Sequence, residues 1–197
     1  MDNKFKLIAD TFGSDRVKLN EPIASHVALN VGGPAKLFFV GTHPREIIRI
    51  VKMSRELKLP ILVFGTGSKM MISDIGFDGV IVKNRTSSIA VIGVKGKVGR
   101  TGIGVSEAMV EADSGVPIGK LVEFLKKQSL DFHTIENIPG TIGGNLFLSK
   151  ALLETVQKIK VIDEDDDIIE IEKDSLNSRK HIILSVVFKF KTERKEV

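Results

Sequence analysis

The hydrophobic positions in the first third of the chain follow the periods of a strand, a helix and a second strand. Residues 36–40 form an apolar run that predicts a strand, and Thr42 followed by Pro44 is typical of a helix start. The helix ends before Pro60, and residues 61–64 form a short apolar run that predicts a buried strand. The apolar positions of the helix recur near the 3.6-residue period. These positions are Ile47, Ile48, Val51 and Leu57.

The middle of the chain combines the same helical period with more strands. Apolar runs predict strands at residues 79–82 and 90–94, and the glycines up to Gly104 predict tight turns or bulges. A second helix has apolar positions spaced i, i+3, i+4 and i+7, so we expect it to pack on a sheet. Its apolar stripe consists of Ile118, Leu121, Val122 and Leu125.

The end of the chain is predicted to be rich in strands around an acidic turn. Residues 158–163 and 168–171 flank the acidic residues 164–167, and residues 181–190 form the final apolar run. The acidic turn lacks the spacing and the glycine of a calcium loop, so we interpret it as a solvated hairpin turn. Together these elements predict an α+β fold with two subdomains, residues 1–85 and residues 86–197.

Composition narrows the classes of ligand and partner. The 197 residues include no cysteine, which excludes disulfides and thiolate-bound metals, and the four histidines lack metal-ligand spacing, so we expect no metal. The net charge of +4 comes from scattered basic residues, so we expect no nucleic-acid partner. The N-terminus leads into no long apolar stretch, so we expect a cytoplasmic protein without a membrane segment.

A glycine-rich turn directly after the strand at residues 61–64 is the strongest chemical signal. Glycines with positive φ turn the backbone sharply and expose successive N–H groups, which form a cradle for phosphate oxygens. Ser68 adds a hydroxyl and Lys69 a positive charge, although a tight loop without a ligand has the same composition. The candidate binding residues are Phe64, Gly65, Thr66, Gly67, Ser68 and Lys69.

A second glycine-rich turn follows the second predicted helix. Its proline fixes one dihedral angle, its glycines permit close backbone approach, and Thr141 and Asn145 can hydrogen-bond a ligand. A structural turn is the alternative interpretation. The candidate binding residues here are Ile138, Pro139, Gly140, Thr141, Gly143, Gly144 and Asn145.

Four motifs, in this order, resemble the flavin domain of the UDP-N-acetylenolpyruvylglucosamine reductase (UDP-N-acetylmuramate dehydrogenase) family. They are Val-Gly-Gly-Pro-Ala at 31–35, Gly-Thr-Gly-Ser at 65–68, Asp-Ile-Gly-Phe-Asp-Gly-Val-Ile at 74–81 and Ile-Pro-Gly-Thr-Ile-Gly-Gly at 138–144. The match runs from about His26 to Phe190. The resemblance implies a two-subdomain FAD-binding fold of the vanillyl-alcohol-oxidase (PCMH) type, in which both turns line FAD.

The resemblance also implies a reaction of peptidoglycan precursor and cell-wall synthesis. In that family NADPH passes a hydride to the flavin, and the flavin passes it to the enolpyruvyl group of a nucleotide sugar. This chain departs from the family pattern: Lys69 stands where asparagine is usual, bulkier residues fill positions 146–148, and Arg179 is only the nearest residue to an essential arginine. The chain also ends at Val197, before the substrate domain that supplies the family's serine acid and glutamate.

Two hypotheses from different classes follow. The chain is an FAD-binding oxidoreductase domain that cannot complete the reduction alone and obtains the substrate half from a protein partner. Alternatively, it is a non-catalytic relative whose scaffold binds another nucleotide or a protein, which Lys69 and the apolar residues at 147–153 favour. A complete reductase would need a general acid from elsewhere, since no residue matches that role. We therefore assign no catalytic residue from the sequence.

Overall fold

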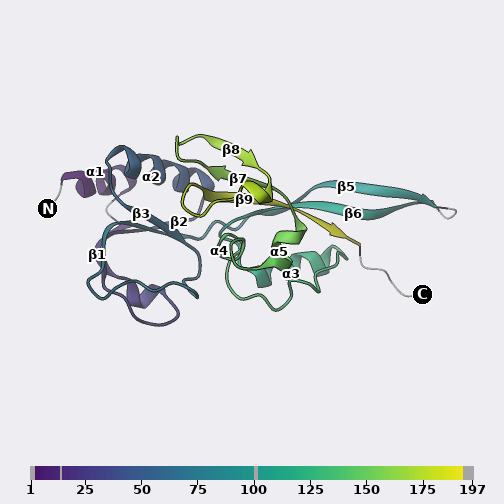
Figure 1. Cartoon of the computed structure of the whole chain (residues 1–197), viewed down its shortest axis with the longest axis horizontal. Helices are drawn as coiled ribbons and strands as arrows, with labels where there is room; N and C mark the ends of the chain where they lie inside the picture. The colour runs from purple at the N-terminus through teal and green to yellow at the C-terminus, as the bar shows by residue number, and fades with distance from the viewer. Residues whose placement is uncertain (1–2, 14, 100–101, 193–197) are drawn as a thin grey trace. The chain divides into compact units, whose positions relative to one another are not determined.

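The computed structural model of the chain describes residues 3–13, 15–99 and 102–192 (Figure 1). The chain divides into two compact units, residues 1–86 (unit 1) and residues 87–197 (unit 2). Each unit has its own β-sheet and its own hydrophobic core. The predicted α+β fold class is confirmed, whereas the assignment of each unit to one half of a cofactor site stays a prediction.

Unit 1 is built on a four-stranded sheet with the order β1-β2-β4-β3. Strand β1 is antiparallel to β2, whereas β4 is parallel to both β2 and β3. The segments that follow the three parallel strands therefore leave from the same edge of the sheet. The elements are α1 (Asn3–Phe12), β1 (Val17–Pro22), the 3-10 helix η1 (Ile23–His26), β2 (Pro34–Gly41), α2 (Pro44–Glu56), β3 (Ile61–Phe64) and β4 (Phe77–Asn84).

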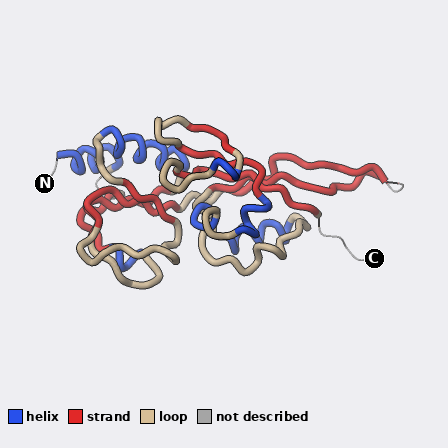
Figure 2. Tube along the Cα trace, viewed as in Figure 1, coloured by secondary structure: helices blue, strands red, loops and turns tan. Residues whose placement is uncertain are grey.

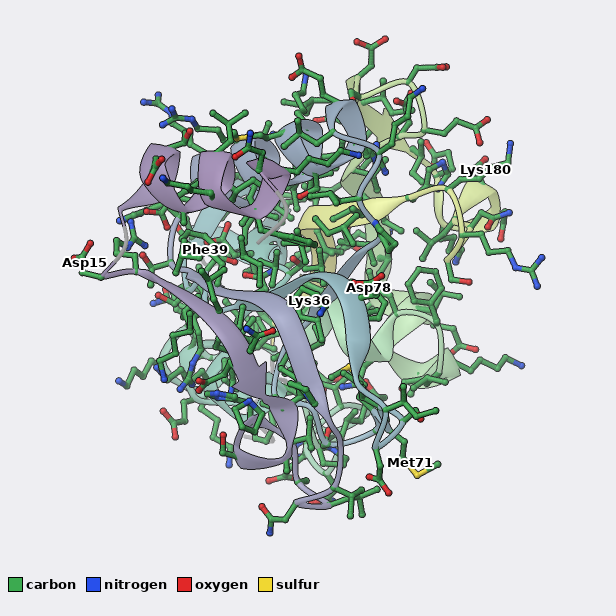
Figure 3. The ribbon with its side chains drawn as sticks, turned by 90° about the vertical axis from the view of Figure 1, so that its left-hand side faces the viewer. Asp15, Lys36, Phe39, Met71, Asp78 and Lys180 are labelled. Carbon is green, nitrogen blue, oxygen red and sulfur yellow. The ribbon has the colours of Figure 1, made fainter. Side chains whose placement is uncertain are left out.

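Both faces of the parallel strands are covered. Helices α1 and α2 lie on one face, and Figure 3 shows Phe39 next to α1, where its ring centre is 4.9 Å from that of Phe12. The segment around η1 covers the other face. The buried cluster on that face consists of Ile23, Val27, Ala35, Phe38, Phe64 and Ile81. Burial on both faces explains why β4 reads as a nearly continuous apolar run. Strand β3 lies at the edge of the sheet, and only Phe64 of its four residues is buried, so the prediction that 61–64 is a buried strand is only partly right.

The start of α2 corrects one prediction. The helix begins at Pro44 with His43 as its N-cap, so the prediction that Thr42 is the cap is wrong. The Glu46 carboxylate explains the difference, because it accepts hydrogen bonds from the backbone N–H groups of both Thr42 (2.9 Å) and His43 (3.2 Å). Arg16 also donates to this carboxylate at 2.6 Å, and these bonds lower the pKa of Glu46 to about 2.

Unit 2 is built on a five-stranded antiparallel sheet with the order β5-β6-β9-β7-β8. Figures 1 and 2 show helices α3, α4 and α5 together on one side of the strands. The core between them includes Val110, Leu121, Leu125, Val186 and Phe188. The elements are β5 (Ile89–Gly99), β6 (Gly102–Asp113), α3 (Ile118–Lys127), α4 (Ile142–Asn145), α5 (Lys150–Thr155), β7 (Val156–Ile162), β8 (Ile168–Ile171), the 3-10 helix η2 (Lys173–Ser175) and β9 (Ile182–Lys191).

The acidic segment between β7 and β8 is the predicted hairpin turn. The two strands pair antiparallel, and the Asp163 N–H donates to the Asp167 carbonyl at 3.0 Å. The Asp163 carboxylate accepts the N–H groups of Asp165 and Asp167, and Asp166 has a φ of 66°. The carboxylate therefore organises its own turn, as aspartates commonly do.

The glycine-rich region after residue 90 forms bulged strands. Strand β5 continues well past residue 94, and its pairing with β6 shifts register between Val91 and Gly93 and again between Lys95 and Gly96. Bulges were predicted here, but the length of β5 was underestimated. No helix of the described residues is long and apolar enough to cross a membrane.

Candidate functional site

The turn at residues 65–68 leaves the sheet of unit 1 directly after β3 and folds back over the η1 segment. Gly67 has a φ of 70°, which disfavours any residue with a side chain. A Cβ on Gly67 would lie 2.9 Å from Cγ1 of Val27, so packing also requires glycine. The Gly67 carbonyl accepts a hydrogen bond from the N–H of Ala28 at 3.3 Å. Residues 26–28 therefore hold the turn from beneath.

This turn carries donors without a protein acceptor. Across the described ranges 3–13, 15–99 and 102–192, the backbone N–H groups of Thr66, Gly67 and Ser68 make no hydrogen bond. The hydroxyl groups of Thr66 and Ser68 lie 3.2 Å apart, and both residues are exposed. Successive free N–H groups beside hydroxyls form the kind of concave donor set that binds phosphate oxygens. The turn can therefore hold an anion.

The residues on either side of the turn have different positions. The Phe64 side chain is 9% exposed and belongs to the core cluster around Phe38. Phe64 therefore supports the turn by packing, and only its backbone is close to the donors. Lys69 is exposed at the end of the turn. Direct contact of either residue with a ligand stays a prediction.

The second turn, at residues 138–145, is anchored within unit 2 by some of its donors, whereas the N–H groups of Gly140, Thr141 and Gly144 have no acceptor among the described residues. The N–H groups of Ile142 and Gly143 donate to the carbonyls of Val116 and Ser114, both at 2.9 Å. The buried Asn145 amide donates to the carbonyls of Pro139 and Thr141, both at 2.9 Å. These groups hold the turn against β6 and α3 and are not available to a ligand.

The shape of the second turn also has structural causes. Gly140 has a φ of 102°, and a Cβ on Gly143 would lie 3.0 Å from Cβ of Ser114. Thr141 is buried, whereas Pro139 and Gly144 are exposed. The exposed backbone at Pro139 and Gly144 is the part of the turn that a ligand can contact.

A cation at the end of β4 lies close to the first turn. In the register of the parallel strands Lys83 is beside Phe64, the last residue before the turn. Its ammonium donates to the His26 carbonyl at 3.1 Å and lies 5.8 Å from the centre of the Phe64 ring. Burial, followed by the positive charge of Arg85, lowers the pKa of Lys83. Within the described part of the chain, neither Lys83 nor Arg85 forms an ion pair with a carboxylate.

The His26 side chain fixes the segment that carries this carbonyl. Its ring stacks on Phe38 with 4.1 Å between ring centres, and Nε2 lies 2.8 Å from Oε1 of Glu21. Lys18 also donates to Glu21 at 2.9 Å, and the bonds from Lys18 and His26 lower the pKa of Glu21. His26 is thus a partnered structural residue.

Sequence reasoning missed Lys83. The signal was available, because a lysine at the end of the apolar run at 79–82 lies at the carboxyl edge of a predicted buried strand. Among the described residues, no group of three histidine or acidic residues has a metal-binding arrangement.

The fold and the first turn define a class of protein, the FAD-binding domains. Residues 35–172 match the family model described as FAD binding domain, and the chain belongs to this family. Free N–H groups, hydroxyls and a nearby cation fit the diphosphate of FAD, so the residues present agree with the cofactor of the family. The expectation of FAD is confirmed at the level of the family.

Within this class the chain is similar to one kind of reductase. UDP-N-acetylenolpyruvoylglucosamine reductase of Clostridium perfringens (strain SM101 / Type A) is 25% identical over 183 residues, which cover 87% of this chain and 54% of the relative. This chain therefore spans about half the length of that relative. The resemblance predicted from the four motifs is confirmed.

Solved structures show the same fold. The structure of UDP-N-acetylenolpyruvylglucosamine reductase from Thermus caldophilus has a TM-score of 0.68 at 18% identity, covering 92% of this chain and 64% of that one. The structure of p-cresol methylhydroxylase with substrate bound has a TM-score of 0.62 at 12% identity, covering 100% of this chain and 45% of that one. The predicted PCMH-type fold is confirmed.

Proposed function

We propose that the chain is the FAD-binding part of an oxidoreductase related to UDP-N-acetylenolpyruvylglucosamine reductase, with the diphosphate of FAD held by residues 65–68. The observation that carries this proposal is the set of N–H groups at Thr66, Gly67 and Ser68 that have no acceptor among the described residues. Of these three residues Gly67 is buried, and a buried donor without a partner is rare unless a ligand or water completes it. The adjacent hydroxyls extend the same donor set.

The second turn has a different role in the proposal. Its exposed backbone at Pro139 and Gly144 lines the cofactor, while Asn145 and Gly143 hold that backbone in place. FAD supplies the hydride-transfer chemistry when it is bound, and the chain's own residues bind and orient it. We place this function in the cytoplasm, where NADPH and nucleotide sugars are available to such an enzyme.

We further propose that reduction of an enolpyruvyl nucleotide sugar by NADPH requires a proton donor that the described residues do not supply. Arg179, the residue nearest to the family's essential arginine, is exposed in a turn, where its N–H donates to the Asn177 side chain at 2.9 Å. No described serine or glutamate matches the acid of that family. A protein partner that carries a substrate domain would complete the reaction.

The test is the visible spectrum of the purified chain, followed by titration of FAD into flavin-free protein. We expect a flavin band, saturable binding at one site, and negligible oxidation of NADPH in the presence of the nucleotide sugar. The Ser68→Asp variant places a negative charge beside the donors and should weaken FAD binding at least about tenfold. Gly119→Asp adds the same charge at an exposed position of α3 with open space around it and should bind FAD normally.

A second candidate function is a scaffold that binds a protein partner. It is supported by Phe147 and Leu148, which are 43% and 63% exposed although Leu146 and Leu152 on either side are buried in the core. Adjacent exposed apolar side chains can form part of an interface. Wild-type protein that binds no FAD at high micromolar concentration would favour this function over the first.

A further inference from the structure

The first turn and the Lys83 ammonium share one supporting segment of unit 1. Lys83 donates to the His26 carbonyl, and a Cβ built on Gly67 would lie 3.1 Å from that same carbonyl oxygen. Ala28, two residues further on, donates to the Gly67 carbonyl. The cation and the donor turn therefore contact residues 26–28 from adjacent positions.

The strand register brings the same two features together independently. Phe64 and Lys83 are partners in neighbouring parallel strands, and partners in register have side chains on the same face of the sheet. Phe64 leads directly into the turn, and the ammonium lies over its ring. Both the backbone path and the side-chain contacts place the cation at the base of the turn.

The bonding of Lys83 is incomplete for a purely structural residue. A lysine ammonium has three donors, and the described residues provide one acceptor, the His26 carbonyl. Arg85 adds a second positive charge nearby, and neither cation has a carboxylate partner in the described ranges. A half-buried cation with like charge beside it destabilises a folded protein unless an anion offsets it.

We propose that Lys83 is the charge partner of the phosphate group held by residues 65–68, and that the His26 carbonyl positions its ammonium for this contact. This inference rests on the proposed function and adds to it a residue that determines affinity. Bound anion satisfies the remaining donors of Lys83 and offsets the repulsion from Arg85. Lys83 therefore stabilises the complex while it destabilises the flavin-free protein.

This opposition separates a ligand-binding role from a structural one. If Lys83 only supported the fold, its loss would lower the stability of the flavin-free protein, and FAD affinity would fall as a consequence. If Lys83 binds phosphate, Lys83→Met leaves the flavin-free protein at least as stable and still weakens FAD binding. The methionine preserves most of the apolar stem against Phe64.

The experiment compares the full chain with Lys83→Met, Lys83→Arg and the control Lys52→Met, an exposed lysine of α2 on the opposite layer of unit 1. Flavin fluorescence gives FAD affinity, inorganic pyrophosphate serves as a competitor, and urea unfolding of flavin-free protein gives stability. We expect Lys83→Met to weaken the binding of FAD and of pyrophosphate at least about tenfold, because hydrogen bonds between charged groups are stronger than those between neutral groups. Lys83→Arg and Lys52→Met should remain within about threefold of wild type.

A second measurement keeps the proposal falsifiable if Lys83→Met does not fold. FAD affinity of the wild type should begin to fall at a pH below the ordinary lysine pKa of 10.5, because burial lowers the pKa of Lys83 and the anion needs its charged form. Lys83→Arg keeps its charge at these pH values, so its affinity should be flatter. If the wild type binds FAD and Lys83→Met binds it with the same affinity, or if Lys83→Arg shows the same pH dependence as the wild type, the inference about Lys83 is overturned and the proposed function is not. Absence of wild-type FAD binding would overturn the proposed function as well.

Discussion

The two glycine-rich turns have similar compositions but differ in the hydrogen bonds that hold them. In the turn at residues 65–68 the N–H groups of Thr66, Gly67 and Ser68 have no acceptor among the described residues. The turn at 138–145 also has such groups, at Gly140, Thr141 and Gly144, but Ile142, Gly143 and Asn145 anchor it by donating to the carbonyls of Ser114, Val116 and its own residues. Glycine content alone therefore does not identify a phosphate cradle. What distinguishes the first turn is that its three N–H groups without acceptors are consecutive and lie beside the hydroxyls of Thr66 and Ser68.

The largest expected effect comes from the first turn. Gly67→Asp combines positive φ, a clash with Val27 and a negative charge, so we expect FAD affinity to fall more than about 100-fold. Flavin titration measures this, with circular dichroism to verify folding and Gly119→Asp as the matched control. Unchanged affinity in a folded Gly67→Asp variant would remove residues 65–69 from the site.

A mutation in the second turn should lower the stability of the protein more than its affinity for FAD. Asn145 is buried and its side chain donates two hydrogen bonds. Asn145→Ala removes both and leaves the Pro139 carbonyl without its donor, so it should lower the free energy of unfolding by about 2–3 kcal/mol. Urea unfolding measures the loss, and the exposed Asn137→Ala is the control from the same loop. If Asn145→Ala lost FAD affinity with full stability, the two turns would share one role and the comparison would be wrong.

Lowering the pH tests how much the Glu46 carboxylate contributes to the stability of unit 1, independently of the glycine-rich turn. The pKa of Glu46 is lowered from 4.5 to about 2, so its ionised form stabilises the protein above pH 4.5 and this contribution is lost as pH falls toward 2. Because Arg16 is partly exposed, we expect a loss of only about 1–2 kcal/mol. Urea unfolding from pH 7 to 3 should show a shallower acid loss in Glu46→Gln than in the control Glu56→Gln. Equal slopes would assign the acid dependence elsewhere.

The smallest effect concerns the hydroxyls of the first turn. Ser68→Ala removes one exposed donor and leaves the backbone N–H groups in place, so FAD affinity should fall about twofold to fivefold. Isothermal titration of FAD measures the change. A loss as large as that of Gly67→Asp would mean that the hydroxyl, and not the backbone, carries the phosphate contact.

The parts of the fold that the sequence predicted well are those with an uninterrupted period. The apolar stripe of Ile118, Leu121, Val122 and Leu125 became the buried face of α3, and the run at 61–64 became β3 within the same bounds. Strand β6 was missed because Gly102 and Gly104 weaken its alternation at the start. Pairing with the long strand β5 holds β6 in the strand conformation, and this pairing cannot be predicted from the local sequence of β6.

The position of the first turn could be predicted from the sequence, but the hydrogen bonds of the two turns could not. The placement of Gly-Thr-Gly-Ser after a buried strand could be read from residues 61–68 alone. The acceptors of the second turn could not, because Ser114 and Val116 lie more than twenty residues before it and reach it only through the fold. The position of Lys83 at the end of an apolar run could be seen in the sequence, but only the pairing of β3 with β4 shows that it lies beside Phe64.

The order of strands in unit 1 also determines when the sheet can form during synthesis of the chain. Strand β4 is the last strand of the sheet in sequence but lies between β2 and β3. Until residues 77–84 leave the ribosome, β2 and β3 cannot be joined, and an edge of each stays unpaired. When β4 enters, it closes the sheet and places Lys83 beside the turn in a single event. The cradle and its cation thus come together before the strands of unit 2 have left the ribosome.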